Sequence, residues 1–132
     1  MQLVPEAAYL YIMQKKLNCK FVEGTDKKYR VCDNGIVISL MQKKARILRH
    51  EVRSDGYLQV SISFKKDVKM KSLHRLVAEA FIENNENKET VNHKDGDKTN
   101  NCVSNLEWNT RSENIQHSVH VLKNQHGKRK KQ

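Results

Sequence analysis

The spacing of apolar residues predicts antiparallel β-structure over residues 28–72. Every second side chain from Leu58 to Phe64 is apolar, as expected for a strand with one buried face. Val68 and Met70 continue this alternation after a Lys-Lys-Asp segment. Asp33-Asn34-Gly35 separates two further β-rich runs, and Asn-Gly in such a position is a strong hairpin signal. Together these patterns predict a small antiparallel sheet.

A helical period of apolar residues predicts three helices elsewhere. Residues 4–17 have this spacing, and so does Leu73 to Ile82, which follows a serine placed to act as N-cap. Thr110-Arg111-Ser112-Glu113 has the form of a capping box and precedes the third apolar stripe. Short strands are expected at residues 90–93 and 106–109, on either side of a loop rich in Asp, Asn and Gly. The fold class is therefore α+β.

The composition indicates a polyanionic partner. The chain has 132 residues, a formal net charge of +10 and a sequence pI of about 9.6, and a charge of this size on a small domain favours nucleic acid. The alternative is that lysine-rich faces only keep the domain in solution. No apolar run is long enough to span a membrane, and no signal-peptide pattern begins the chain. We therefore expect a soluble, intracellular protein without a membrane partner.

The cysteine pattern argues against cysteine-based chemistry. Cys19, Cys32 and Cys102 are odd in number and widely spaced, and they contain no Cys-x-x-Cys pair. Neither a disulfide framework nor a structural zinc site is indicated. We expect three reduced thiols.

Residues 91–97, Val-Asn-His-Lys-Asp-Gly-Asp, hold the best candidate chemistry. They place His93 beside carboxamide and carboxylate oxygens, and Asn114 follows at the start of a predicted helix. Oxygen donors suit hard divalent cations, and the pKa of histidine lies close to neutrality. His117 lies one helical turn after Asn114, where it could join the metal ligands. A phosphodiester would be a natural substrate for this pairing of base and cation.

Several basic side chains could contact DNA phosphates. Four lysines lie near one predicted turn of the sheet, where the alternative is a charged edge that resists aggregation. Arg75 lies in the first turn of the helix that begins at Leu73, next to His74, for which a buried structural role and a catalytic role are both open. The candidate DNA-binding residues are Arg75, Lys65, Lys66, Lys69, Lys71, Lys94 and Arg111.

These motifs resemble those of the HNH endonucleases, particularly the phage and intron-encoded homing endonucleases. Upstream, two segments look like the sheet module called NUMOD4 that often accompanies this nuclease. The resemblance covers roughly residues 28–120. It is carried by His74–Phe81, Val91–Gly96, Asn100-Asn101, Asn105–Trp108 and Glu113-Asn114, and for the sheet module by Tyr29–Val37 and Asp55–Tyr57.

The resemblance implies a ββα-metal (HNH, His-Me finger) nuclease that cleaves double-stranded DNA with Mg²⁺ or Mn²⁺. His93 would be the general base that activates water, and Asn114 would bind the metal. Asn92 stands where many relatives carry Asp as the other metal ligand, which predicts weak metal binding until DNA phosphate contributes; Asp95 and Asp97 either compensate or only shape the turn. Asn105 would brace the loop.

The apolar spacing, the basic C-terminal composition and the resemblance together predict a division of the chain. Residues 1–27 would be a helical extension, residues 28–72 a NUMOD4-like sheet, residues 73–122 the nuclease unit with its ββα core at residues 89–122, and residues 123–132 a basic tail. A monomer would nick one strand, and a double-strand break would need a homodimer or two sequential events. For a phage-encoded protein, the compartment would be the cytoplasm or nucleoid of a bacterial host.

Two other functions remain open on sequence alone. In the first, the chain is a non-catalytic DNA-binding module in which the basic sheet contacts DNA and the Asn/Asp loop is only structural. In the second, it is an interaction protein that uses the N-terminal helix. Neither predicts metal-dependent cleavage, and the second also predicts no salt-sensitive DNA binding.

Overall fold

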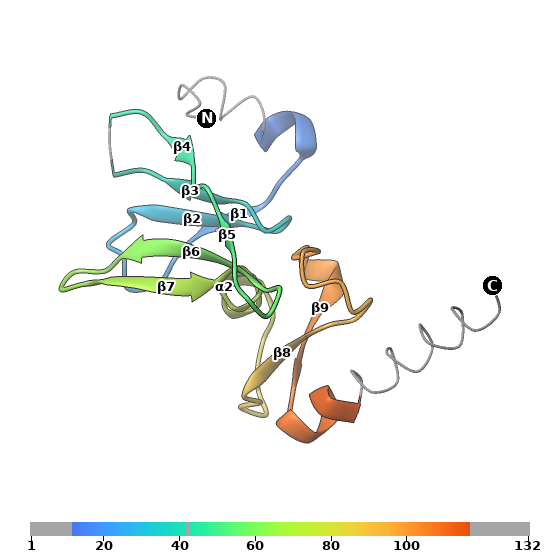
Figure 1. Ribbon diagram of the computed structural model, residues 1–132. Helices are drawn as coiled ribbons and strands as arrows, with labels where there is room; N and C mark the ends of the chain where they lie inside the picture. The colour runs from blue at the N-terminus through green and yellow to red at the C-terminus, as the bar shows by residue number, and fades with distance from the viewer. Residues whose placement is uncertain (1–11, 42, 117–132) are drawn as a thin grey trace.

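The computed structural model describes residues 12–41 and 43–116 (Figure 1). Two antiparallel sheets, the helix α2 and a separate hairpin follow in chain order, and residues 12–15 and 111–116 are also helical. The elements are β1 Cys19–Phe21, β2 Tyr29–Cys32, β3 Val37–Ser39, β4 Arg46–Ile47, β5 Glu51–Val52, β6 Leu58–Ser63, β7 Val68–Ser72, α2 Leu73–Phe81, β8 Thr90–His93 and β9 Leu106–Asn109. A 3-10 turn at Val103–Asn105 leads into β9. The expected α+β architecture is confirmed.

The first half of the molecule forms two sheets, with strand orders β1-β2-β3-β4 and β5-β6-β7. The antiparallel pairing and the β2–β3 hairpin agree with the sequence pattern, but the division into two sheets was not expected. β1 also lies within residues 1–27, where only helix was expected. In the hairpin turn, Gly35 has a positive φ of 90° and donates its backbone N–H to Cys32 O at 2.9 Å.

The β6–β7 pair corrects one prediction from alternation. Val60 and Ile62 are buried as predicted, and their cross-strand neighbours are Lys71 and Lys69. Directly paired residues share one face of a sheet, so the two lysines lie on the side of the buried residues, with both ammonium groups over the ring of Phe64. Val68 and Met70 therefore lie on the opposite face and are exposed.

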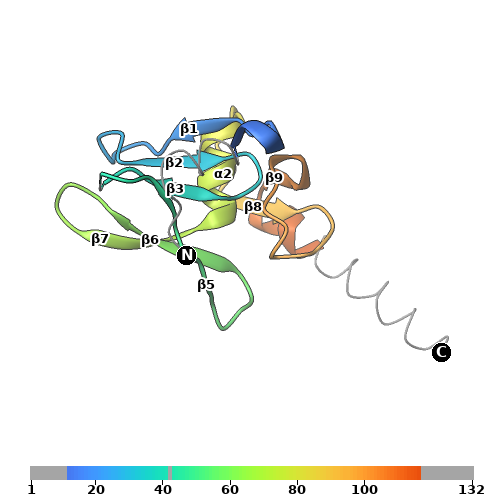
Figure 2. The same ribbon diagram turned by 90° about the horizontal axis from the view of Figure 1, so that it is seen from above.

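Helix α2 is the central packing element. It contacts β2, β6 and β7 on one side and β8 and β9 on the other (Figure 2). Leu73, Leu76, Val77 and Ala78 are buried in a common core with residues of both sheets and the hairpin. Ser72 is the N-cap residue, as predicted, but its hydroxyl accepts a hydrogen bond from the Arg53 guanidinium instead of capping the helix.

A second unit is formed by β8, β9 and the helical residues 111–116. The predicted capping box is present. Glu113 N donates to Thr110 Oγ1 at 3.2 Å, and Thr110 N donates to Glu113 Oε1 at 3.1 Å. Asn114 lies in the first turn, where its N–H bonds to Thr110 O. The predicted strand–loop–strand–helix order is therefore observed.

The expectation of three reduced thiols is wrong for two of them. Cys19 on β1 and Cys32 on β2 form a disulfide, with their Cα atoms 4.0 Å apart. The two residues are directly opposite each other in the antiparallel register. Their separation along the chain gave no indication of this pairing. Cys102 is a free thiol.

Some predictions fall wholly or partly outside the described residues. Of the helix expected at 4–17, residues 12–17 are described; residues 12–15 are helical, but the helix ends before Lys16, which has a positive φ of 53°. His117, the tail at 123–132 and the end of the ββα core lie outside. Across the described ranges, no helix has the length and apolarity that crossing a membrane requires.

Candidate active site

His93 lies at the end of β8 in a cluster of three aromatic rings. Its side chain is 4% exposed, and its ring centroid is 5.1 Å from that of His74 and 5.8 Å from that of Tyr57. The rings of Tyr57 and His74 stack with their centroids 4.9 Å apart. Three separate elements, the β5–β6 turn, α2 and β8, thus bring these rings together.

The protonation of His93 is set by Asn101 and by burial. His93 Nε2 is 2.7 Å from Asn101 Oδ1. Because a carbonyl oxygen can only accept, Nε2 carries the hydrogen and Nδ1 has a free lone pair in the neutral ring. Burial lowers the pKa of His93, while the Asn101 hydrogen bond and the charges of Asp95 and Asp97 oppose this shift. The imidazole is therefore neutral near pH 7, the form that a general base requires.

Asn105 holds the loop that follows His93. Its Nδ2 donates to Asp95 Oδ1 and to Asn100 O, both at 2.9 Å, and its Oδ1 accepts the backbone N–H of Asp95 at 3.1 Å. Both amide hydrogens and the carbonyl oxygen are thus engaged. These three hydrogen bonds tie both ends of the loop together.

Asp95 and Asp97 shape the same loop. Asp95 accepts hydrogen bonds from Asn100 and from the N–H of Asp97, and Asp97 accepts from the hydroxyl and N–H of Thr99. Hydrogen bonding from Asn100 lowers the pKa of Asp95, and hydrogen bonding from Thr99 lowers that of Asp97. Of the two roles considered for these carboxylates, shaping the turn is the one that the contacts support.

Asn92, next to His93 on β8, and its cross-strand neighbour Glu107 offer oxygen donors. Asn92 is buried, lies directly opposite Glu107 in the β8–β9 register, and has Nδ2 3.5 Å from Glu107 Oε1. This contact leaves the carbonyl oxygen of Asn92 for another partner. Amide and carboxylate oxygens fit a hard divalent cation. Within residues 12–41 and 43–116 no group of three His, Cys, Asp or Glu side chains forms a ready-made metal cage.

His74 has the most strongly shifted pKa in the site. Burial lowers it from 6.5 to about 4, and the neighbouring charges of His93, Arg75 and Arg53 act in the same direction, against Asp55. Its Nδ1 is buried and has no hydrogen-bond partner in the part of the chain that the structure describes. His74 is therefore a neutral packing partner of His93 near pH 7.

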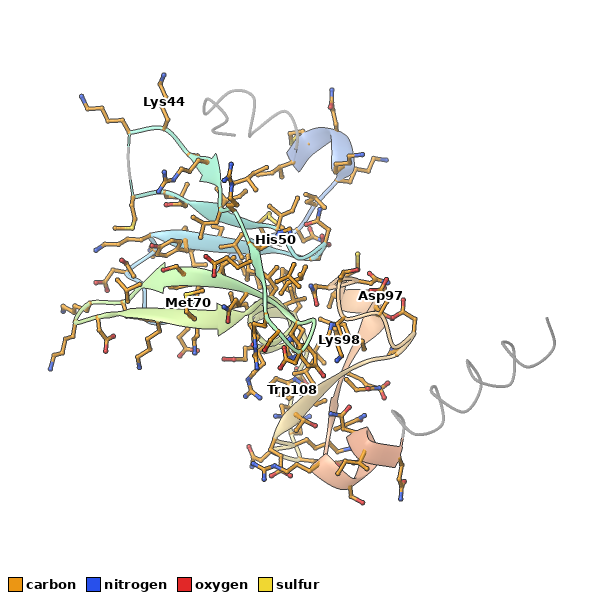
Figure 3. All side chains as sticks on the ribbon, viewed as in Figure 1. Lys44, His50, Met70, Asp97, Lys98 and Trp108 are labelled. Atoms are coloured by element: carbon orange, nitrogen blue, oxygen red, sulfur yellow. A yellow bond between two sulfur atoms is a disulfide. The ribbon has the colours of Figure 1, made fainter. Side chains whose placement is uncertain are left out.

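Turns of both sheets contact the loop that follows His93. Lys98 Nζ donates to Asp55 O at 2.7 Å and lies 4.7 Å from the ring centre of Tyr57, which ties the loop to the β5–β6 turn (Figure 3). Val103 N donates to Asp33 O in the β2–β3 turn. Gly35 in that turn lies directly against Asn101. Sequence reasoning gave no site role to Tyr57, Asn101 or Lys98, although the first two lie in segments that carry the resemblance, because no local pattern indicates contacts between distant turns.

Gly35→Ala is expected to destabilise the protein by about 2 kcal/mol or more, through strain at positive φ and through overpacking. An added Cβ would lie 2.9 Å from Asn101 Cβ. Gly24→Ala is the matched control, since φ there is also positive, at 82°, but the Cβ would meet only Phe64 atoms at 3.6 Å. Urea unfolding measures both, and equal losses would remove the Gly35–Asn101 contact as the cause.

The candidate DNA-binding residues lie in different places. Arg75 is held by the protein itself, because its Nη1 donates to Glu89 O at 2.8 Å and its guanidinium lies 5.3 Å from the ring centre of Trp108. Lys94 and Arg111 are exposed at the hairpin and its helix. The β6–β7 turn, with Lys65 and Lys66, is at the opposite end of the molecule from the hairpin (Figures 1 and 2).

A strand that ends at the buried His93, a second strand and a capped helix with Asn114 in its first turn together form a ββα unit. Residues 71–116 match the family described as HNH endonuclease. These residues of the chain therefore form an HNH endonuclease domain.

Two relatives and one solved structure support this assignment. The chain is 35% identical over 100 residues to DNA endonuclease I-HmuI of Bacillus phage SP01, covering 76% of this chain and 56% of the relative. It is 45% identical over 101 residues to an uncharacterised HNH endonuclease of Acanthamoeba polyphaga mimivirus, covering 74% and 24%. The structure described as DNA binding and cleavage by the HNH homing endonuclease I-HmuI matches with a TM-score of 0.70 and 34% identity, over 78% of this chain and 58% of that one. The chain thus spans little more than half of I-HmuI and a quarter of the mimivirus protein.

Proposed function

We propose that this chain is a metal-dependent DNA endonuclease of the homing type, with His93 as its general base. The observation that carries the proposal is the hydrogen bond between His93 Nε2 and Asn101 Oδ1 at 2.7 Å. It leaves Nδ1 as the basic nitrogen of a neutral imidazole, at the end of the strand that also carries Asn92. An activated water attacking a phosphodiester requires such a base.

Asn92 and Asn114 would hold the cation, Mg²⁺ or Mn²⁺, with His117 as a further candidate ligand. When bound, the cation supplies positive charge that offsets the charge on the scissile phosphate and the leaving 3′ oxygen. His93 Nδ1 takes the proton of the attacking water, while Asn105 and the Asp95 turn hold the loop in place. Attack by water with departure of the 3′ oxygen leaves 5′-phosphate and 3′-hydroxyl ends.

Double-stranded DNA is the proposed substrate. The net charge of +10 favours a polyanion, and exposed Lys94 and Arg111 lie on the same unit as His93. Lys65, Lys66, Lys69 and Lys71 would give a second, remote phosphate contact, whereas the internal contacts of Arg75 make it the weakest of the proposed DNA ligands. One such site serves one strand, so a monomer nicks and a homodimer could cut both strands.

The test is incubation of supercoiled plasmid with the protein in Mg²⁺, Mn²⁺ or EDTA. We expect relaxed circles with either metal and none with EDTA. Binding of plasmid without cleavage under every metal condition would favour the alternative of a non-catalytic DNA-binding module. Repeating the binding measurement across salt concentrations tests the phosphate contacts, because each neutralised phosphate steepens the loss of affinity with salt.

Asn92→Asp is expected to tighten metal binding by the DNA-free protein about tenfold, because it replaces a neutral ligand by an anionic one. The wild-type protein should bind Mn²⁺ weakly until DNA phosphate adds anionic oxygens. Mn²⁺ binding followed by electron paramagnetic resonance measures both, with Asn92→Leu as the variant that removes the oxygen donor. Tight binding by DNA-free wild type, or unchanged affinity in both variants, would count against Asn92 as a ligand.

A further inference from the structure

We infer that Asn101 is a positioning residue that fixes the tautomer and orientation of His93, and that the β2–β3 turn of the first sheet holds Asn101 in place. This inference deepens the proposed function and rests on it for its catalytic meaning. It extends the active site beyond the ββα unit to a hairpin turn in the first half of the chain.

The first argument is the hydrogen bond itself. A neutral imidazole carries one hydrogen, on either nitrogen, and only a specific partner selects between them. Asn101 Oδ1 is an acceptor 2.7 Å from His93 Nε2, so it stabilises the Nε2–H form. Both side chains are 4% exposed, so water competes poorly for this bond. The stacked rings of Tyr57 and His74 orient the imidazole plane, but ring packing does not distinguish between the two nitrogens.

The second argument is that the surroundings leave Asn101 little freedom. A Cβ added at Gly35 would lie 2.9 Å from Asn101 Cβ and 3.2 Å from its carbonyl oxygen, so Asn101 occupies the space that a side chain at position 35 would need. Two residues further along the loop, Val103 N donates to Asp33 O at 2.8 Å. The loop is thus fastened to the β2–β3 turn by a hydrogen bond and by close packing. The glycine allows the approach because it has no side chain.

The function of His93 as a base therefore depends on the β2–β3 turn, which is distant in the sequence. If Asn101 no longer accepts from Nε2, part of the His93 population carries its hydrogen on Nδ1 and cannot take the proton of water there. In metal sites, removing the partner that orients a histidine typically costs about 10–100-fold in affinity or activity. We expect a loss of that size in kcat, with the KM for DNA unchanged, because Asn101 is buried and contacts the base instead of DNA.

The first test measures the tautomer directly, by ¹⁵N NMR of histidine-labelled, DNA-free protein at pH 8 in EDTA. The variants are Asn101→Leu and Asn101→Asp, both close to asparagine in shape; aspartate keeps the acceptor and leucine removes it. The control is Asn100→Leu, which loses the bond to Asp95 but does not touch the imidazole. We expect the Nε2–H form in wild type, Asn101→Asp and Asn100→Leu, and a mixture in Asn101→Leu. An Nδ1–H form in wild type, or no change in Asn101→Leu, would overturn the inference.

The second test follows single-turnover plasmid cleavage by the same variants. Asn101→Leu should lose about 10–100-fold in rate, and Asn101→Asp should recover most of it. If the wild-type protein cleaves plasmid and Asn101→Leu cleaves it equally fast, the inference about Asn101 is wrong, while the proposed function is retained. Inactive wild type removes the proposed function, while the NMR spectra still decide whether Asn101 sets the tautomer.

Discussion

Replacing His93 by glutamine is expected to reduce plasmid cleavage by about 10²–10⁴-fold, the usual contribution of a general base. Glutamine is the informative substitution because its amide Nε2 can still donate to Asn101 Oδ1, whereas it has no basic nitrogen. His93→Ala should lose as much activity. The alanine variant should also be less stable by about 1–3 kcal/mol, since His93 is 4% exposed and its removal leaves a void beside His74 and Tyr57.

The measurement combines cleavage rates with DNA affinity and urea unfolding for wild type and both variants. A loss of cleavage at unchanged DNA affinity assigns His93 to the chemical step. Full cleavage by the folded glutamine variant would exclude His93 as the base. Because stability is measured separately, the alanine variant also shows how much the aromatic cluster contributes to the fold.

Much of the fold follows from local sequence patterns. The alternation at Leu58, Val60 and Ile62, the turn glycine at Gly35 and the capping box at Thr110 each act within a few residues. Each was predicted correctly for that reason. The alternation was misleading only at β7, where Val68 and Met70 are exposed. Register against β6 decides which face of β7 is covered, and that is not a property of β7 alone.

The candidate site was predictable only in part, because its central contacts join distant turns. The motif around His93 and Asn114 is contiguous enough to be found by spacing, and Asn105 was expected to brace the loop, as its hydrogen bonds indicate. The packing of Tyr57 on His74, and of Gly35 on Asn101, depends on how the sheets meet α2. The Cys19–Cys32 disulfide was missed for the same reason, since it depends on register across β1 and β2.

The stability of the protein is expected to fall as pH decreases from 6.5 to about 4, because of His74. The folded protein lowers the pKa of this ring to about 4, mainly by burial, against 6.5 in the unfolded chain. Between these values the unfolded state binds more protons, so the free energy of unfolding decreases as pH falls and levels off below about 4. The full effect is about 3 kcal/mol. His93 acts in the same direction, because its pKa is also lowered.

Urea unfolding at pH 7.5, 6, 5 and 4 measures this effect, with His74→Phe as the matched variant. Phenylalanine keeps a ring between Tyr57 and His93 but cannot be protonated, so its stability should depend less on pH in this window. The carboxylates of Asp95, Asp97 and Glu113 do not interfere with this comparison. Their pKa values are lowered from the ordinary values of 3.8, 3.8 and 4.5. The stability that they contribute is therefore lost mainly at the acid end of this pH range or below it. An identical pH dependence in both proteins would show that His74 is not the group responsible. In the proposed mechanism a neutral His74 would also matter for catalysis, because a charged ring 5.1 Å from His93 would weaken His93 as a base.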